Sequence, residues 1–151
     1  MKKRILTVGA IAIVIILITT LIVQAVSIHK MKQEQAAHFD QYLSSAVQSY
    51  EEYKRTGYEF QYEHAMFNLH SASSIALLLD DDEYNGLHGV LQSLCGSYFS
   101  SPDDFALFMD EIVEILKDYE SHKSAEALYT QLKNVDNRLF AMLLERTEKI
   151  D

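Results

Sequence analysis

Hydrophobic positions follow two patterns along this chain: a continuous run near the amino terminus, and stripes at helical spacing beyond it. The run covers residues 5–26, ILTVGAIAIVIILITTLIVQAV, and it directly follows Lys2, Lys3 and Arg4. A helix of about 20 apolar residues is long enough to cross the hydrocarbon core of a bilayer. The pattern therefore predicts a transmembrane signal-anchor helix at 5–26, which contacts membrane lipid and follows a cytoplasmic basic flank at residues 1–4.

Two interpretations of this run remain open. It is longer than the roughly 7–15 apolar residues of a cleaved signal peptide, which favours a retained anchor. Val23-Gln24-Ala25 nevertheless resembles a signal-peptidase site, and cleavage near Ala25 would give a secreted protein. Three basic residues precede the run, whereas only Lys30 and Lys32 follow it closely. The positive-inside rule thus predicts a cytoplasmic amino terminus and an extracytoplasmic remainder at the cell membrane.

Beyond residue 26, apolar side chains recur at steps of three and four residues, which places them on one face of an α-helix. No helix breaker lies between Ser27 and Thr56, so this helix is expected to continue from the membrane span and to end at Gly57. A second helix is expected at 58–79, and a third along the stripe from Leu87 to Tyr98, with its start left open near Gly86 and Gly89. Further helices are expected at 102–119 and 125–142. The residues expected to form the core are Phe39, Leu43, Ala46, Tyr50 and Tyr53; Phe60, His64, Phe67, Ser71, Ser74 and Leu78; Leu87, Leu91, Leu94 and Tyr98; Phe105, Phe108, Met109, Ile112, Leu116 and Tyr119; and Ala125, Leu128, Leu132, Val135, Leu139 and Met142.

No segment beyond the span shows the strict alternation of a half-buried strand. The clearest helix start is Ser101-Pro102-Asp103-Asp104, where the serine hydroxyl is expected to cap the helix, proline fits the first turn and the carboxylates complement the positive helix end. The predicted fold is all-α: a single N-terminal transmembrane helix followed by an antiparallel bundle of four to five amphipathic helices. The bundle is expected to form one domain at residues 27–151.

Charge and cysteine content narrow the possible partners. Residues 27–151 hold 22 acidic and 10 basic residues, a net charge of −12 with histidine neutral. Nucleic-acid phosphates would repel such a domain, so nucleic acid is not expected as a partner. Cys95 is the only cysteine, which excludes an internal disulfide. We expect a small buried apolar residue there; a redox thiol and a dimer cross-link are the alternatives.

No motif in the sequence points to catalysis, a metal or a cofactor. Counted from Asp81, the acidic turn at residues 80–83 echoes a calcium loop, but position 12 is Gln92 instead of a bidentate glutamate. His64 and His70 are six residues apart on one predicted helix, so they do not share a face as an i, i+4 metal pair does. No serine lies in a G-x-S-x-G turn, and no motif pairs the cysteine with a histidine. The sequence thus predicts no enzyme activity, no catalytic or metal-ligating residue and no cofactor.

Tyrosines are frequent around the predicted turn at Gly57: Tyr50, Tyr53, Tyr58 and Tyr62. Because tyrosine is amphipathic, these residues suit either the rim of a small core or a protein interface, and we take them as candidate interaction residues. The predicted function is a protein-interaction or structural role in the cell envelope, with another envelope protein or a second copy as partner. The alternative is a sensor-like helical bundle that binds a small ligand, although receptors of that kind normally have a second span.

Overall fold

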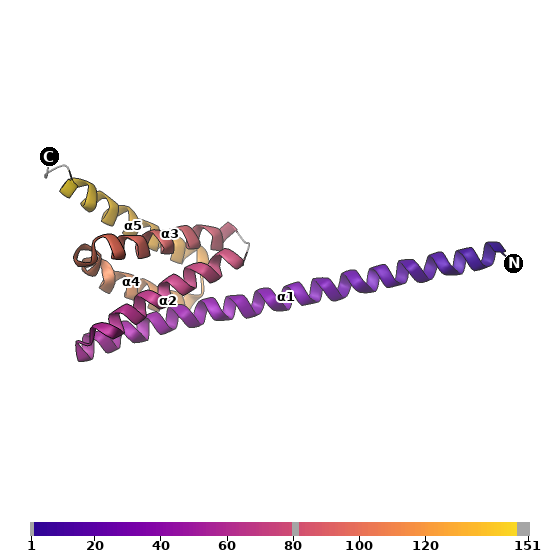
Figure 1. The fold of residues 1–151 in the computed structure, drawn as a ribbon, viewed down its shortest axis with the longest axis horizontal. Helices are drawn as coiled ribbons and strands as arrows, with labels where there is room; N and C mark the ends of the chain where they lie inside the picture. The colour runs from indigo at the N-terminus through magenta and orange to yellow at the C-terminus, as the bar shows by residue number, and fades with distance from the viewer. Residues whose placement is uncertain (1, 80–81, 148–151) are drawn as a thin grey trace. The chain divides into compact units, whose positions relative to one another are not determined.

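The computed structural model describes the backbone of residues 2–79 and 82–147, and the side chains of residues 13–79 and 84–146. These residues form five α-helices and no strand, so the all-α prediction is confirmed for them (Figure 1). The chain divides into two compact units, Met1–Glu34 and Gln35–Asp151, and the first helix contributes to both. The helices are α1 (Lys2–Thr56), α2 (Glu59–Leu78), α3 (Asp82–Ser100), α4 (Pro102–His122) and α5 (Ala125–Thr147).

The first unit is the amino-terminal part of α1. In the described residues, α1 is the one helix that is long and apolar enough to cross a membrane. Its large apolar side chains are exposed, for example Ile16 and Leu21 at 64% each. The hydroxyls of Thr19 and Thr20 each donate a hydrogen bond of 2.9 Å to the carbonyl one turn earlier. A helix that satisfies its own polar groups in this way meets the main requirement of the bilayer interior, so α1 is a candidate membrane span.

The second unit is a helical bundle with one continuous core. The predicted core positions on α1, α3, α4 and α5 are buried, with Tyr53, Tyr98, Phe108 and Met142 half-buried at the edge of the core. The helix α3 packs against α2, α4 and α5, and α4 packs against α5. The fully buried aromatic side chains Phe39 and Phe105 come from α1 and α4. The apolar spacing in the sequence therefore identified the buried face of four of the five helices correctly.

The predicted core face of α2 is wrong. Phe60 and Phe67, which were expected in the core, are 67% and 62% exposed, and Leu78 is 56% exposed. The small residues on the opposite face explain this difference, because they let the backbone of α2 approach α3 closely. The Ser73 hydroxyl reaches the His88 carbonyl oxygen of α3 at 3.1 Å. The side chains that α2 buries are Ala65, Met66, Asn68, Leu69, Ala72, Ser73 and Ala76.

Backbone conformation fixes the helix ends. Gly57 has a φ of 71°, a left-handed conformation that glycine adopts without strain, and its N–H donates to the Tyr53 carbonyl oxygen at 2.7 Å. The predicted end of α1 at this residue is confirmed. The predicted Ser101 hydroxyl cap of α4 is wrong, because the Ser101 side chain makes no cap hydrogen bond. The backbone carbonyl oxygen of Ser101 accepts a hydrogen bond of 3.0 Å from the Phe105 N–H. Pro102 lies in the first turn, as expected.

The acidic turn at residues 80–83 falls largely outside the described residues, because Asp80 and Asp81 are not described and the side chains of 82 and 83 are not either. The backbone is helical from Asp82 onward. Gln92, the residue at the twelfth position of the calcium-loop echo, lies inside α3. Residues 82–92 therefore form helix rather than a cation-binding loop.

Candidate functional site

Three of the four candidate tyrosines lie together. Tyr50 and Tyr53 come from the end of α1, Tyr62 comes from the first turns of α2, and Tyr98 joins them from the end of α3. Ring centroids are 5.9 Å apart for Tyr50 and Tyr62, 5.1 Å for Tyr53 and Tyr62, and 5.7 Å for Tyr62 and Tyr98. We call these four residues the tyrosine cluster. Tyr58 is 70% exposed and lies outside it.

The turn at Gly57 explains why this cluster forms. Tyr50 and Tyr53 are three residues apart on one face of α1, and the turn directs α2 back along that helix, so Tyr62 meets them. Sequence analysis placed Tyr98 at the end of the α3 stripe but did not connect it with this turn. Only the packing of α3 against α2 brings it there, and no local signal in the sequence could have shown that.

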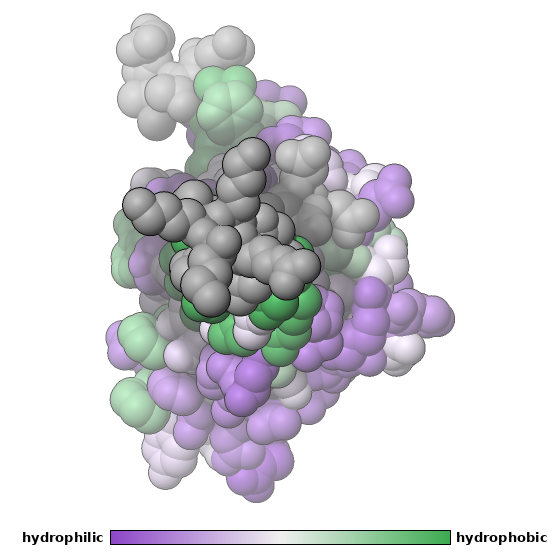
Figure 2. Space-filling view, turned by 90° about the vertical axis from the view of Figure 1, so that its right-hand side faces the viewer, coloured by the Kyte–Doolittle hydropathy of each residue, from purple (hydrophilic) through white to green (hydrophobic). Residues whose placement is uncertain are grey.

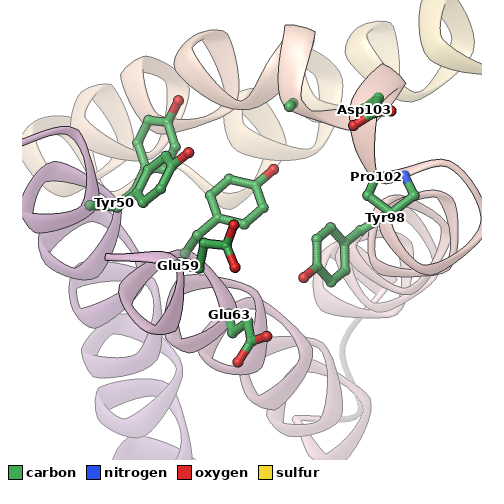
Figure 3. Close-up of a pocket in the computed structure, with 9 residues that line it drawn as sticks. Tyr50, Glu59, Glu63, Tyr98, Pro102 and Asp103 are labelled. Carbon is green, nitrogen blue, oxygen red and sulfur yellow. The ribbon is translucent and has the colours of Figure 1, made fainter. Parts of the chain in front are cut away.

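The tyrosine cluster lines a pocket of about 460 Å³ (Figure 3). Three carboxylates also line it: Glu59 and Glu63 from α2, and Asp103 from α4. Figure 3 shows Glu59 and Glu63 on one side of the opening and Tyr98 with Asp103 on the other. Among residues 13–79 and 84–146, no basic side chain forms an ion pair with any of the three. We call this site the acidic pocket; the remaining residues that line it are Pro102 and Ala106.

The electrostatics of the acidic pocket follow from burial and from these carboxylates. Burial raises the pKa of Tyr98, and the nearby charges of Glu63 and Glu59 raise it further. Burial is also the main cause of the raised pKa of Tyr62, followed by the neighbouring tyrosines. The phenols therefore stay neutral at physiological pH and present the faces of intact aromatic rings. The negative charge of the pocket comes from the carboxylates alone.

The hydroxyls of two neighbouring tyrosines differ in their partners. The Tyr50 hydroxyl donates a hydrogen bond of 2.9 Å to Asp110 Oδ1. The Tyr62 hydroxyl is buried and has no hydrogen-bond partner in the described part of the chain. A buried polar group without a partner typically costs about 1–3 kcal/mol. The wall of the acidic pocket therefore contains a polar atom that the fold leaves unsatisfied.

A second pocket of about 490 Å³ shares Tyr50 with the first. Its charges are paired: Lys54 Nζ lies 2.8 Å from Asp110 Oδ1, and Lys117 Nζ lies 2.9 Å from both Glu51 and Glu114. We call it the ion-paired pocket, and Val113 completes its lining. Two lysines thus neutralise most of the charge of its three carboxylates.

The described residues offer no support for metal or thiol chemistry. Within residues 13–79 and 84–146, no three histidine, cysteine, aspartate or glutamate side chains lie close enough together to hold a metal ion. The carboxylates of the acidic pocket are therefore too far apart to form one coordination shell. Cys95 is 3% exposed, and burial raises the pKa of its thiol to about 12. It occupies the buried position expected from the sequence and is a neutral thiol at physiological pH.

The exposed face of α2 is the second feature with functional potential. It carries the α2 seam, which we define as Phe60, His64, Phe67, Ser71, Ser74 and Leu78. The His64 ring stacks between two exposed aromatic rings, at 5.9 Å from Phe60 with an interplanar angle of 22° and at 6.4 Å from Phe67 with 18°. Its Nδ1 lies 3.1 Å from the Ser49 hydroxyl, which ties the seam to α1. Among the coloured residues of Figure 2, most are hydrophilic and the hydrophobic ones form smaller patches.

Comparisons with protein-family models, curated proteins and solved structures find no match to this chain. Two features of the described residues have the properties of a functional site. One is the acidic pocket, a concave site with aromatic walls and three carboxylates. The other is the α2 seam, an exposed stripe of aromatic, histidine, serine and leucine side chains.

Proposed function

We propose that the chain is a single-pass membrane protein with an extracytoplasmic antiparallel helical bundle that associates with a second copy of itself through the α2 seam. In this proposal residues 5–26 are retained as the anchor, the amino terminus is cytoplasmic, and the protein has a structural or protein-interaction role in the cell envelope without enzyme activity. The length of the apolar run and the basic residues that precede it support the anchor and its orientation.

The exposed α2 seam is the observation that carries the proposal. Its residues follow one another at steps of four, three, four, three and four, which is the a/d spacing by which helices pair. Phe60 and Phe67 expose more than 60% of their surface, and Leu78 more than 50%. Large apolar side chains aligned on one helix face are typical of an association surface, whereas isolated ones are not.

The properties of the seam favour a second copy as the partner. A domain with a net charge of −12 repels its own copies over most of its surface, but the seam contains no carboxylate. The large side chains of Phe60, His64 and Phe67 lie in the amino-terminal half of the seam. The small side chains of Ser71 and Ser74 lie in its carboxyl-terminal half, before Leu78. In an antiparallel pair, Phe67 of one copy faces Ser71 of the other, and Phe60 faces Leu78. Large side chains then meet smaller ones along the whole contact, which helix packing requires.

Dimerisation of the full chain in an uncharged detergent tests this proposal. Phe67→Asp places a carboxylate in the seam, and we expect the dissociation constant to rise at least about tenfold, because a central aromatic contact is worth more than about 1.4 kcal/mol. Phe140→Asp is the matched control, since Phe140 on α5 is also 62% exposed. Sedimentation of both variants measures the effect. A dimer that tolerates Phe67→Asp would contradict pairing through the seam, and a monomeric parent chain would favour a different envelope protein as partner.

Protease access tests the orientation separately. A carboxyl-terminal tag on the full chain should be degraded when protease is added to intact cells or spheroplasts, because residues 27–151 lie outside in the proposed topology. An internal cytoplasmic protein serves as the control for membrane integrity. Complete protection of the tag, with the control also intact, would mean that the orientation is inverted.

The acidic pocket favours a second candidate function, the binding of a small ligand as in a sensor. Its volume of about 460 Å³ falls within the range of small-molecule sites. The pocket and the seam use different residues of α2, although the pocket residue Glu63 lies beside Phe60 and Phe67 on the helix surface.

A further inference from the structure

The acidic pocket combines a wall of aromatic rings with carboxylates that lack counter-ions. From this geometry we infer that it binds a small organic polyammonium ion, in which positively charged nitrogens are separated by short alkyl chains. This inference is independent of self-association through the α2 seam.

The aromatic wall supplies the first part of the recognition. The ring planes within the tyrosine cluster are tilted by 34° to 55° to one another, so together they form a concave surface rather than a flat stack. The negative face of an aromatic ring attracts an ammonium group within about 6 Å of its centroid. The protein already uses this interaction beside the pocket, where Lys54 Nζ lies 5.9 Å from the centroid of Tyr50. The rings also offer apolar surface to the alkyl chains between the nitrogens.

The carboxylates supply the second part. Glu59 and Glu63 are four residues apart on α2, where like charges repel, and Asp103 adds a third negative charge from α4. No described lysine or arginine relieves this repulsion by an ion pair. A bound cation would relieve it, and a ligand with several positive charges would do so at more than one carboxylate.

The spacing of these groups favours an organic cation over a metal ion. A divalent metal needs several oxygen ligands within about 2.6 Å. In the described part of the chain no three potential ligands lie close enough to provide such a shell. The carboxylates are instead distributed around a pocket of about 460 Å³, a separation that an extended ligand can bridge.

The Tyr62 hydroxyl provides an independent indication. It is buried in the wall of the pocket, and in the described residues it has no hydrogen-bond partner. Because this oxygen is closed off from solvent, an ammonium group in the pocket can pair with it only if the Tyr62 ring rotates, and such a contact would remove the cost of the unpaired hydroxyl. The ion-paired pocket has no such orphaned group among its described residues, and its lysines already pair with its carboxylates.

Titration of the full chain with spermidine, a linear triamine, tests the inference. The chain contains nine tyrosines, four of them in the cluster, and no tryptophan, so tyrosine fluorescence contains the signal of the cluster without a tryptophan background. In an uncharged detergent at low salt we expect saturable 1:1 binding. Tyr98→Leu should weaken it at least about tenfold, whereas Tyr98→Phe, which keeps the aromatic ring, should stay within about threefold of the parent. Calorimetry provides a second readout that does not depend on the mutated fluorophore.

Charge variants separate a site from general attraction to an acidic protein. Glu63→Gln should weaken spermidine binding about fivefold or more, while Glu114→Gln in the ion-paired pocket removes the same charge and should change it less than about twofold. Magnesium ion should displace spermidine only at a concentration about 100-fold higher, since no coordination shell exists. Equal effects of the two glutamine variants, unchanged binding by Tyr98→Leu, or no saturation at about 10 mM spermidine would each overturn the inference.

Discussion

The acidic pocket and the ion-paired pocket share Tyr50 and differ little in size, yet their charges are arranged in opposite ways. Each has three carboxylates in its lining. In the ion-paired pocket two lysines of the chain pair with all three carboxylates and neutralise most of their charge. In the acidic pocket the described residues provide no such partner, and aromatic rings take the place of the lysine side chains. The ion-paired pocket thus holds its own cations, whereas the acidic pocket can take a cation from a ligand.

The exposure of the ion pairs sharpens this contrast. Lys54 and Asp110 are 55% and 65% exposed, so their pair contributes little to folding. Its larger effect is to occupy the carboxylate, which is then unavailable to a ligand. The same argument applies to Lys117, which lies between Glu51 and Glu114.

The largest expected effect comes from the core that both pockets share. Leu132→Asp on α5 buries an unpaired charge at a position that is 0% exposed, and should destabilise the fold by more than about 4 kcal/mol. Leu144→Asp on the same helix, at a position that is 49% exposed, should cost less than about 0.5 kcal/mol. Thermal unfolding followed by circular dichroism compares the two. If Leu132→Asp melts like the parent chain, the core assignment is wrong.

A lysine introduced into the acidic pocket should make it resemble its neighbour. Ala106→Lys brings an ammonium group to the carboxylates, and spermidine affinity should fall about 100-fold, or about 2.7 kcal/mol, because the lysine competes for the same groups. Leu107→Lys adds the same charge at the next residue, which is 69% exposed and does not line the pocket. Calorimetric titration of both variants measures the difference. Equal losses would show that net charge, rather than the pocket, controls binding.

Two phenylalanine substitutions test the contributions of the Tyr50 and Tyr62 hydroxyls to stability. Tyr50→Phe removes the hydrogen bond to Asp110 and should lower the free energy of unfolding by about 1 kcal/mol. Tyr62→Phe removes a buried hydroxyl that has no partner in the described residues, and should leave stability unchanged or raise it by up to about 1 kcal/mol. Urea unfolding of each variant measures these changes. Similar losses from both substitutions would show that the Tyr62 hydroxyl is satisfied in solution.

The smallest expected effect is a pH dependence in the ion-paired pocket. The hydrogen bond from Lys54, and then that from Tyr50, lowers the pKa of Asp110 below its usual value. Because the folded state binds this proton less tightly than the unfolded state, the stabilisation is complete above about pH 4 and is lost as the pH falls through the lowered pKa. The group is largely exposed, so the effect should be only about 0.5 kcal/mol.

Stability measured between pH 2 and pH 6 checks this dependence. Asp110→Asn should remove the part of the stability loss at acid pH that this group causes, and Lys54→Met should make that loss smaller, because both remove the ion pair. An acid limb that neither variant changes would contradict a contribution from this pair.

Sequence patterns predicted the buried faces of α4 and α5 because each has one apolar stripe opposite a charged face. On α2 two stripes compete, one with large residues such as Phe60 and Phe67 and one with small residues such as Ala65 and Ala72. Hydrophobicity favoured the large stripe, but close packing against α3 placed the small one inside. The tyrosine cluster was predicted in part for a similar reason. Position near a turn grouped Tyr50, Tyr53 and Tyr62, which the structure brings together, with Tyr58, which lies outside the cluster. It gave no information about Tyr98, and a role of these residues in an interface stays a prediction.

The burial of Cys95 has a consequence for the lifetime of any assembly that the chain forms. In the proposed topology the bundle lies in an oxidising compartment, where an exposed single thiol would form a disulfide that links two copies and breaks more slowly than the copies exchange. A thiol that is 3% exposed and neutral at physiological pH does not undergo this reaction readily. Pairing through the α2 seam would therefore remain governed by concentration, and copies could separate and re-form as the local density of the protein in the membrane changes.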